Sequence, residues 1–91
     1  MNFVVRYQDK VVSEDIARLS FEVRDRVRVA IEEKLQVAPE VYGKPLRKSL
    51  RGYRSLRVSD YRVIFRVEKS IVKIFAIGHR SVIYKMTKGR I

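Results

Sequence analysis

Three apolar segments in the second half of the chain constrain its fold most strongly. They run over residues 54–58, 61–67 and 71–77, and apolar side chains dominate the two longer ones. Ser59-Asp60 joins the first two segments, and residues 68–70 join the last two. Connections of two and three residues between such segments are typical of β-hairpins. The sequence therefore predicts an antiparallel three-stranded meander.

The first forty residues carry one strand pattern and two helical patterns. Alternation over residues 3–7 predicts a short strand that joins the sheet. A hydroxyl cap at Ser13, followed by two acidic residues, predicts a short helix to about Leu19. From Phe21 onward, apolar residues recur at the i, i+4 and i+7/i+8 spacing of a longer helix, which Pro39 is expected to end.

These elements predict the fold class α+β, with two N-terminal helices packed on an antiparallel sheet of about four strands. Compact domains commonly run to about 100–150 residues, so the 91 residues are expected to form one domain, 1–91. Residues 82–88 follow the last predicted strand, and their pattern fits either a helical turn or an irregular tail.

The composition excludes several classes of protein. The chain has no cysteine for a disulfide or a thiolate metal site, and one histidine is too few for a histidine-rich site. No apolar run approaches the ~18–20 residues that span a bilayer, and residues 1–6 lack the features of a signal peptide. We therefore expect a soluble, cytoplasmic protein with no membrane partner, no metal and no other cofactor.

Positive charge is concentrated in the second half of the chain. Residues 1–40 hold 7 basic and 8 acidic side chains, whereas residues 41–91 hold 14 basic and 2 acidic ones. The net charge is therefore −1 for the first part and +12 for the second, which gives +11 in total. A surface of this kind is typical of a protein that binds nucleic acid or an acidic partner protein.

Two arginines are predicted to face each other across the first hairpin. If Ser59-Asp60 is a two-residue turn, Arg57 lies opposite Arg62, and Leu56 lies opposite Val63. Like charges in opposite positions destabilise a sheet, and an anion bound at this place would explain why they are tolerated. The sequence thus predicts a sheet with one apolar face and one cationic face.

Other side chains could extend this site. The basic residues just upstream could follow a phosphate backbone: Lys44, Arg47, Lys48, Arg51 and Arg54. Tyr84 lies outside the strand pattern and is favoured as a base-stacking platform, whereas Tyr53 and Tyr61 are more typical of core positions. The alternative is that these charges only keep the sheet edge soluble.

The residue types present restrict any catalytic mechanism. Clustered carboxylates for a metal are missing, because Asp60 and Glu68 are the only acids after residue 40. RNA can be cleaved without a metal when its own 2′-hydroxyl attacks the adjacent phosphate. A protein then needs only to align the backbone, stabilise the transition state and assist two proton transfers.

The roles in such a mechanism can be assigned only in part. Arg57, Arg62 and Arg80 suit charge stabilisation because arginine stays protonated. The same property makes arginine a poor base, which leaves His79, Tyr84 or a nearby lysine for proton transfer.

Residues 42–67 and 78–85 resemble the RelE-like toxins of the RelE/ParE superfamily, and the likeness covers essentially the whole chain. The most specific pieces are Leu-Arg-Val-Ser-Asp-Tyr-Arg at positions 56–62 and His79-Arg80 followed by Tyr84. The resemblance implies a microbial-ribonuclease-like α+β fold and ribosome-dependent, metal-independent cleavage of messenger RNA. It also implies a RelB-type antitoxin as partner, in a complex that could bind operator DNA.

The resemblance also implies roles for single residues. Arg57 and Arg62 stand at the family's phosphate-binding strand positions, Arg80 at its transition-state or acid position, and Tyr84 at its base-stacking position. The best-known members have lysines in the strand before the Asp-Tyr-Arg segment, where this chain has Arg54, Ser55 and Arg57. The resemblance therefore does not identify the general base.

Two other functions fit the same sequence. ParE-like toxins share the fold but act on DNA gyrase and are not nucleases, and fold alone does not fix function. A basic nucleic-acid-binding module without catalysis is the third class. The cluster of Arg57, Arg62, Arg80 and Tyr84 favours RNA cleavage over both.

Overall fold

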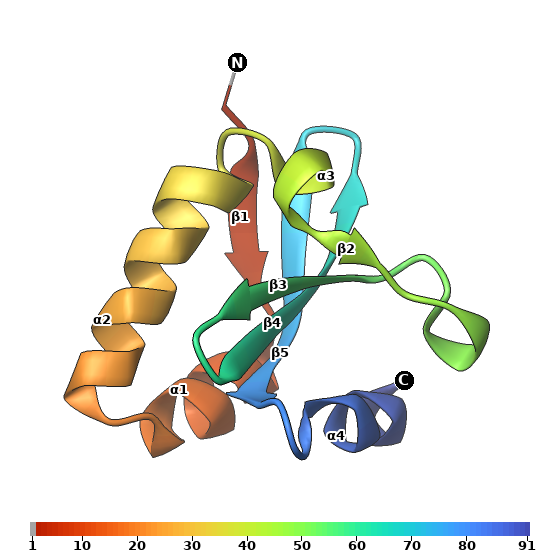
Figure 1. Cartoon of the computed structure of the whole chain (residues 1–91). Helices are drawn as coiled ribbons and strands as arrows, with labels where there is room; N and C mark the ends of the chain where they lie inside the picture. The colour runs from red at the N-terminus through yellow and green to blue at the C-terminus, as the bar shows by residue number, and fades with distance from the viewer. Residues whose placement is uncertain (1) are drawn as a thin grey trace.

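The computed structural model describes residues 2–91, in which five strands form one mixed sheet (Figure 1). The strands are β1 (Val4–Tyr7), β2 (Lys44–Pro45), β3 (Arg54–Val58), β4 (Tyr61–Glu68) and β5 (Ile71–His79), in the spatial order β1-β5-β4-β3-β2. The predicted α+β class and the antiparallel meander of β3, β4 and β5 are confirmed. Two details differ from the expectation: β1 pairs with β5 in parallel, and the short β2 extends the sheet beyond β3.

The helical segments are η1 (Val11–Asp15) continuing into α1 (Ile16–Arg18), α2 (Phe21–Ala30) continuing into η2 (Ile31–Leu35), α3 (Pro39–Tyr42), η3 (Lys48–Leu50) and α4 (Ile83–Arg90). The two predicted N-terminal helices are present, with different ends. The first begins before Ser13, because burial of Val11 draws the chain into a turn that starts at the carbonyl of Gln8. The second ends at Leu35, and Pro39 begins α3, where its missing N–H has no consequence.

The main core lies between the sheet and the helices α2 and η2 (Figure 1). The predicted core side chains of β3, β4 and β5 all belong to it: Leu56, Val63, Phe65, Val72 and Ile74. From the helices, Val27, Ile31 and Leu35 complete the same cluster. Ser20 starts α2 by accepting a hydrogen bond from the backbone N–H of Val23 (3.3 Å), which fixes where this covering helix begins.

The opposite face of the sheet is covered in part by α4. Residues 83–90 form this helix, which settles the conformation that the sequence left open. Ile83 packs with Tyr53, Ile64 and Ala76 in a second, smaller apolar cluster. The expectation that this face is cationic was therefore wrong in part, because Ile83 of α4 packs on it in an apolar cluster.

A bulge in β5 changes which side chains share a face. Ile64 pairs with Ala76, but its neighbour Phe65 pairs with Ile74, so Phe75 has no partner in β4. Phe75 and Ala76 both pack in the cluster under α4. Beyond the bulge the alternation is reversed, as expected when one extra residue enters a strand. Along residues 2–91, no helix is long and apolar enough to cross a membrane.

Candidate functional site

A groove on the α4 face gathers side chains from four elements. Lys44 from β2, Ser55 and Arg57 from β3, Arg62 from β4 and Tyr84 from α4 line a hollow of about 260 Å³. The strand register brings them together, because Lys44 pairs with Ser55 and Arg57 pairs with Arg62. The predicted Arg57–Arg62 juxtaposition is thereby confirmed.

Two hydrogen-bonded contacts fix the shape of the groove. The phenol Oη of Tyr84 lies 3.3 Å from Oγ of Ser55, which ties the first turn of α4 to β3. Nη1 of Arg62 donates to the carbonyls of Ser59 (3.0 Å) and Tyr61 (2.8 Å), which holds this guanidinium against the β3–β4 turn. Arg57 is exposed. The groove thus combines one tethered guanidinium with one exposed to solvent.

The cations of the groove have no carboxylate among the residues that line it. Glu68, one of the two acids after residue 40, lies at the far end of β4 and pairs with Lys73 (3.0 Å) and Arg66 (3.2 Å). Its hydrogen bond and charge interaction with Lys73, together with the charge of Arg66, lower the pKa of Glu68. Neither Glu68 nor Asp60 lines the groove, so the lining side chains carry an excess of positive charge.

Arg80 directly follows β5, which ends at His79. The backbone N–H of Arg80 donates to the carbonyl of Asp60 (2.8 Å), which places Arg80 beside the β3–β4 turn. Gly78, two residues earlier, pairs with Arg62 and faces Ile83 of α4. Arg80 itself is not among the residues that line the groove.

His79 lies on the other side of the sheet. It pairs with Tyr61 of β4, its ring meets the edge of that tyrosine at 5.5 Å between centroids, and its Nδ1 lies 2.8 Å from Oγ of Ser81. Ile77, which shares its face by alternation, belongs to the core under α2. The structure does not bring the predicted base candidate His79 to Arg57 and Arg62.

The upstream basic residues divide into two groups. Arg47, Lys48 and Arg51 are exposed on the segment between β2 and β3. Arg54 instead donates to the carbonyls of Glu40 (3.3 Å) and Gly43 (2.8 Å) at the end of α3. This guanidinium holds a helix end in place, so it is less free for phosphate than the others.

Among the tyrosines, Tyr84 alone was favoured as a stacking platform, and it alone lines the groove. Tyr53 is buried and packs edge-on against Phe75 at 4.9 Å. Sequence reasoning missed Ser55 as a lining residue, although its position two residues before Arg57 was a signal that both share a face.

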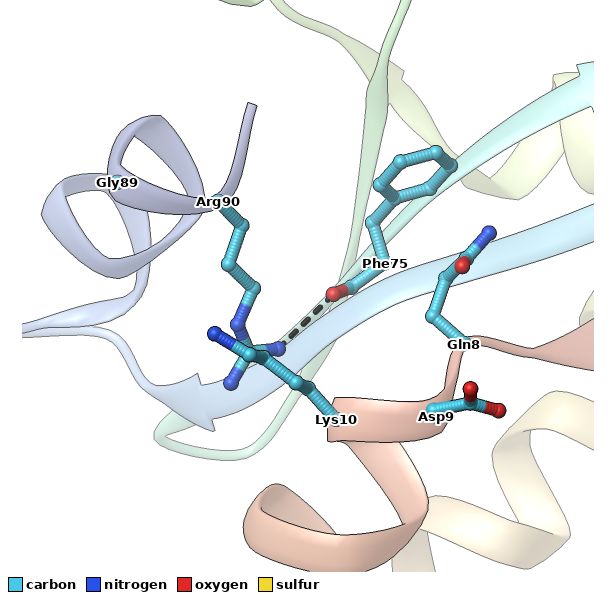
Figure 2. A pocket seen from close by; sticks show the side chains of 6 residues that line it. All are labelled: Gln8, Asp9, Lys10, Phe75, Gly89 and Arg90. Atoms are coloured by element: carbon cyan, nitrogen blue, oxygen red, sulfur yellow. Dashed lines mark hydrogen bonds between the residues drawn. The ribbon is translucent and has the colours of Figure 1, made fainter.

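A separate hollow of about 250 Å³ lies beside the end of α4, and no residue that lines it lines the groove (Figure 2). It is lined by Gln8, Asp9, Lys10, Phe75, Gly89 and Arg90. Figure 2 shows the guanidinium of Arg90 bound to the carbonyl of Phe75, a contact of 3.0 Å. Its principal cation is thus already engaged in joining α4 to β5.

The side chains of residues 2–91 offer no group of three or more histidines, cysteines or carboxylates that could hold a metal ion. Chemistry in the groove would rest on guanidinium, ammonium, hydroxyl and phenol groups.

Comparisons with known proteins identify the family to which this chain belongs. Residues 5–84 match the model of the family described as the ParE toxin of type II toxin-antitoxin systems. Toxin RelE of Mycobacterium tuberculosis is 41% identical over 54 residues, which span 57% of this chain and 56% of that protein. The matched segment is thus little more than half the length of this curated relative.

Solved structures show the same fold. The toxin–antitoxin complex RelBE2 of Mycobacterium tuberculosis matches with a TM-score of 0.78 and 28% identity over 88% of this chain and 100% of that one. A mutant of the E. coli toxin RelE in the free state matches with a TM-score of 0.75 and 18% identity, over 99% and 94% of the two chains. The chain belongs to the ParE toxin family of type II toxin-antitoxin systems, within the RelE/ParE superfamily, and its fold is RelE-like.

Proposed function

We propose that the chain is a ribosome-dependent, metal-independent endoribonuclease that cleaves messenger RNA and so inhibits translation. The observation that carries this proposal is the groove, where Lys44, Arg57 and Arg62 meet Tyr84 without a carboxylate among the lining residues. Guanidinium groups bind phosphate through paired donors, and a phenol ring offers a stacking plane for a splayed base. The groove therefore suits one nucleotide step of a single RNA strand.

The proposed reaction uses a nucleophile from the RNA. The 2′-oxygen forms a bond to the adjacent phosphorus and loses its proton, while the bond from phosphorus to the 5′-oxygen breaks and that oxygen gains a proton. Arg57 and Arg62 would stabilise the charge on the phosphate oxygens, and Arg80 would act at the transition state or the leaving group. Lys44 and Tyr84 are the groups of the groove that can carry a proton.

The ribosome would supply what the groove lacks. His79, the one histidine of the chain, lies across the sheet from Arg62 and so cannot serve as acid or base in the groove. Alignment of reacting groups can contribute roughly 7–11 kcal/mol of a barrier, so RNA held in a reactive shape would compensate for weak acid–base chemistry. The net +12 of residues 41–91 favours docking onto ribosomal RNA.

A RelB-type antitoxin is the proposed protein partner of this chain. Two similar structures are toxin–antitoxin complexes: RelBE2 of Mycobacterium tuberculosis and RelB–RelE of Methanococcus jannaschii. We expect an acidic or amphipathic segment of the antitoxin to dock on the basic half of this chain and to cover the groove or displace α4. Association should be fast at low salt and slower as salt rises.

One alternative function is inhibition of DNA gyrase. It is favoured because residues 5–84 match the family of the ParE toxin. One experiment separates the two: a labelled messenger is incubated with the protein, with and without programmed ribosomes, beside a gyrase supercoiling assay. The proposal predicts cleavage only with ribosomes and no effect on gyrase. Equal cleavage of naked RNA would contradict ribosome dependence, and gyrase inhibition without cleavage would establish the alternative.

A further inference from the structure

The helix α4, which carries Tyr84 into the groove, is too short to be stable alone. It spans eight residues, Ile83–Arg90, whereas isolated helices shorter than about 12–15 residues are marginal in water. Its position must therefore come from contacts with the rest of the chain. Two of its own side chains, Ile83 and Thr87, are fully buried, and Tyr84 in its first turn contacts Ser55.

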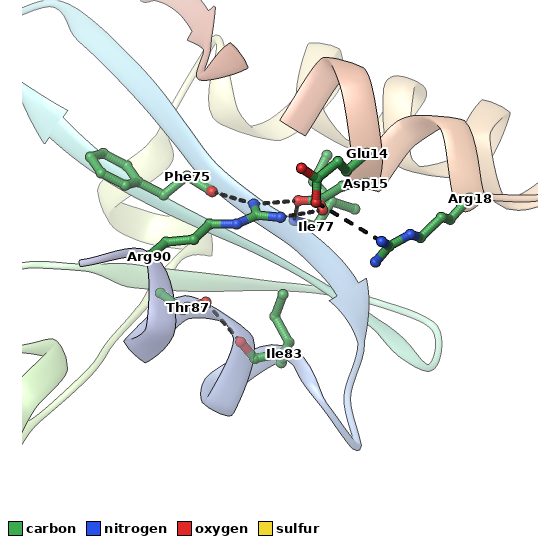
Figure 3. Close-up of polar contacts among 8 residues, drawn as sticks. All are labelled: Glu14, Asp15, Arg18, Phe75, Ile77, Ile83, Thr87 and Arg90. Carbon is green, nitrogen blue, oxygen red and sulfur yellow. Dashed lines mark hydrogen bonds and ion pairs between the residues drawn. The ribbon is translucent and has the colours of Figure 1, made fainter. Parts of the chain in front are cut away.

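The last turn of α4 is anchored by an ion pair across the chain. Nη2 of Arg90 lies 2.6 Å from Oδ1 of Asp15, and Nη1 lies 2.8 Å from Oδ2 (Figure 3). The side chain of Asp15 is fully buried and that of Arg90 is 13% exposed. The two-point contact with Asp15 raises the pKa of Arg90.

The same two side chains complete the edge of β5. The strand β1 covers β5 only as far as Ile74, where Tyr7 is its partner. Beyond that point Asp15 accepts a hydrogen bond from the backbone N–H of Ile77 (2.9 Å), and Arg90 donates to the carbonyl of Phe75 (3.0 Å). Figure 3 shows both contacts at one stretch of β5. Along this part of β5, the ion pair therefore occupies the position that a neighbouring strand would take.

This geometry has a consequence for the groove. Tyr84 and Arg90 are six residues apart on one helix, about 9 Å along its axis. The contact of Tyr84 with Ser55 holds one end, and the contact of Arg90 with Asp15 holds the other. Without the second anchor, α4 could tilt about its first turn and move the phenol of Tyr84 away from Arg57 and Arg62.

We propose that Arg90, held by Asp15, is a positioning residue for the groove: the pair fixes α4 on β5 so that Tyr84 lies beside Arg57 and Arg62. This inference rests on the proposed ribonuclease function for its activity readout. Arg90 does not line the groove and acts only through Tyr84.

The test compares Arg90→Met with Arg28→Met. Arg28 also forms a short ion pair, with Asp25 at 2.6 Å, but both partners are about half exposed, and exposed pairs contribute little. In a ribosome-dependent cleavage assay we expect Arg90→Met to lower kcat about tenfold or more with KM nearly unchanged, because a misplacement of about 1 Å can cost on the order of 10²-fold. Arg28→Met should match the unchanged protein.

Two further measurements separate positioning from general loss of structure. In a Tyr84→Ala background, adding Arg90→Met should cause no further loss of kcat, because both changes act through the same phenol. Arg90→Lys keeps the charge but not the two-point contact, and should lie between Arg90→Met and the unchanged protein. Losses that multiply in the double variant, or wild-type kcat in both Arg90 variants, would overturn the proposal.

Amide hydrogen exchange tests the anchoring without any activity. Arg90→Met should speed exchange in residues 84–90 while leaving residues 61–67 of β4 unchanged. Unchanged exchange in α4 would overturn the inference even if the protein cleaves RNA. If the unchanged protein did not cleave RNA at all, the proposed function would fail, whereas faster exchange in α4 would still support the anchoring role.

Discussion

The face of the sheet under α2 and the face under α4 differ in both packing and charge. On α2, cations are balanced within the helix, as where Arg28 pairs with Asp25 and Glu32. In the groove under α4, Arg57 and Arg62 are opposite each other without an acid among the lining residues. Charge that is balanced within the chain needs no partner, whereas unbalanced charge on a sheet indicates one. The difference separates the face that stabilises the fold from the face that is proposed to act.

The largest expected effect on stability is in the main core. Phe65 is fully buried, so Phe65→Ala should destabilise the protein by about 3–5 kcal/mol, through lost apolar burial and the cavity left behind. Phe21→Ala is the matched control, because Phe21 is 85% exposed and should shift stability within about ±0.5 kcal/mol. Urea unfolding measures both. Equal losses in the two variants would contradict the assignment of the core.

The next effect should appear in function and not in stability. Arg80 is exposed beside the β3–β4 turn, so Arg80→Ala should leave the free energy of unfolding within about ±0.5 kcal/mol. Cleavage should fall on the order of 10²–10³-fold, as when one donor to a transition-state charge is removed, and growth arrest on expression should be lost. Lys88→Ala removes an exposed cation of α4 and serves as control. Full toxicity of Arg80→Ala would remove Arg80 from the site.

A smaller effect is expected where the core meets the groove. A Cβ on Gly43, just before Lys44, would collide with the ring of Phe65 and the carbonyl of Pro39. Gly43→Ala should therefore destabilise by about 1–3 kcal/mol. A Cβ on Gly89 of α4 meets no atom, so Gly89→Ala should be neutral or stabilise by up to about 1 kcal/mol. Thermal unfolding of both variants distinguishes a close contact from a general requirement for glycine.

The smallest effect concerns the acid at the far end of β4. Lys73 and Arg66 lower the pKa of Glu68 below its ordinary value of 4.5. A depressed pKa means that the folded state favours the charged form, so this contribution is present above pH 4.5 and is lost as pH falls through the lowered pKa. Glu68→Gln should therefore reduce stability slightly at pH 7 and leave it unchanged well below pH 4, as measured by urea midpoints. A difference that persisted in acid would show that the charge is not responsible.

The sequence predicted the meander, the register of its first hairpin and the core side chains because turn length and alternation are local properties. The two-residue turn at Ser59-Asp60 sets Arg57 opposite Arg62, whatever else the chain does. The helix α4 could not be decided in the same way. Its stability comes from contacts of Ile83 and Arg90 with distant residues, and eight residues carry too little periodic signal.

The position of His79 shows why the side of the sheet on which a candidate site residue lies could not be predicted from the sequence. In a regular β5, His79 would share the face of Lys73 by alternation, on the side of the sheet opposite the core. The bulge at Phe75 reverses this order, so His79 shares the α2 side of the sheet with Ile77, whereas Gly78 faces α4. A bulge depends on how two strands pack, which one strand's sequence does not show. The role of Lys44 likewise depends on the two-residue strand β2.

The central claim is that Arg57 and Arg62 face each other in order to bind and activate RNA. The most direct measurement is single-turnover cleavage of ribosome-bound messenger by the double variant Arg57→Gln/Arg62→Gln, with urea unfolding on the same preparation. We predict that cleavage is lost while stability is unchanged or slightly higher, because two like charges no longer oppose each other. Cleavage at the rate of the unchanged protein would contradict the claim.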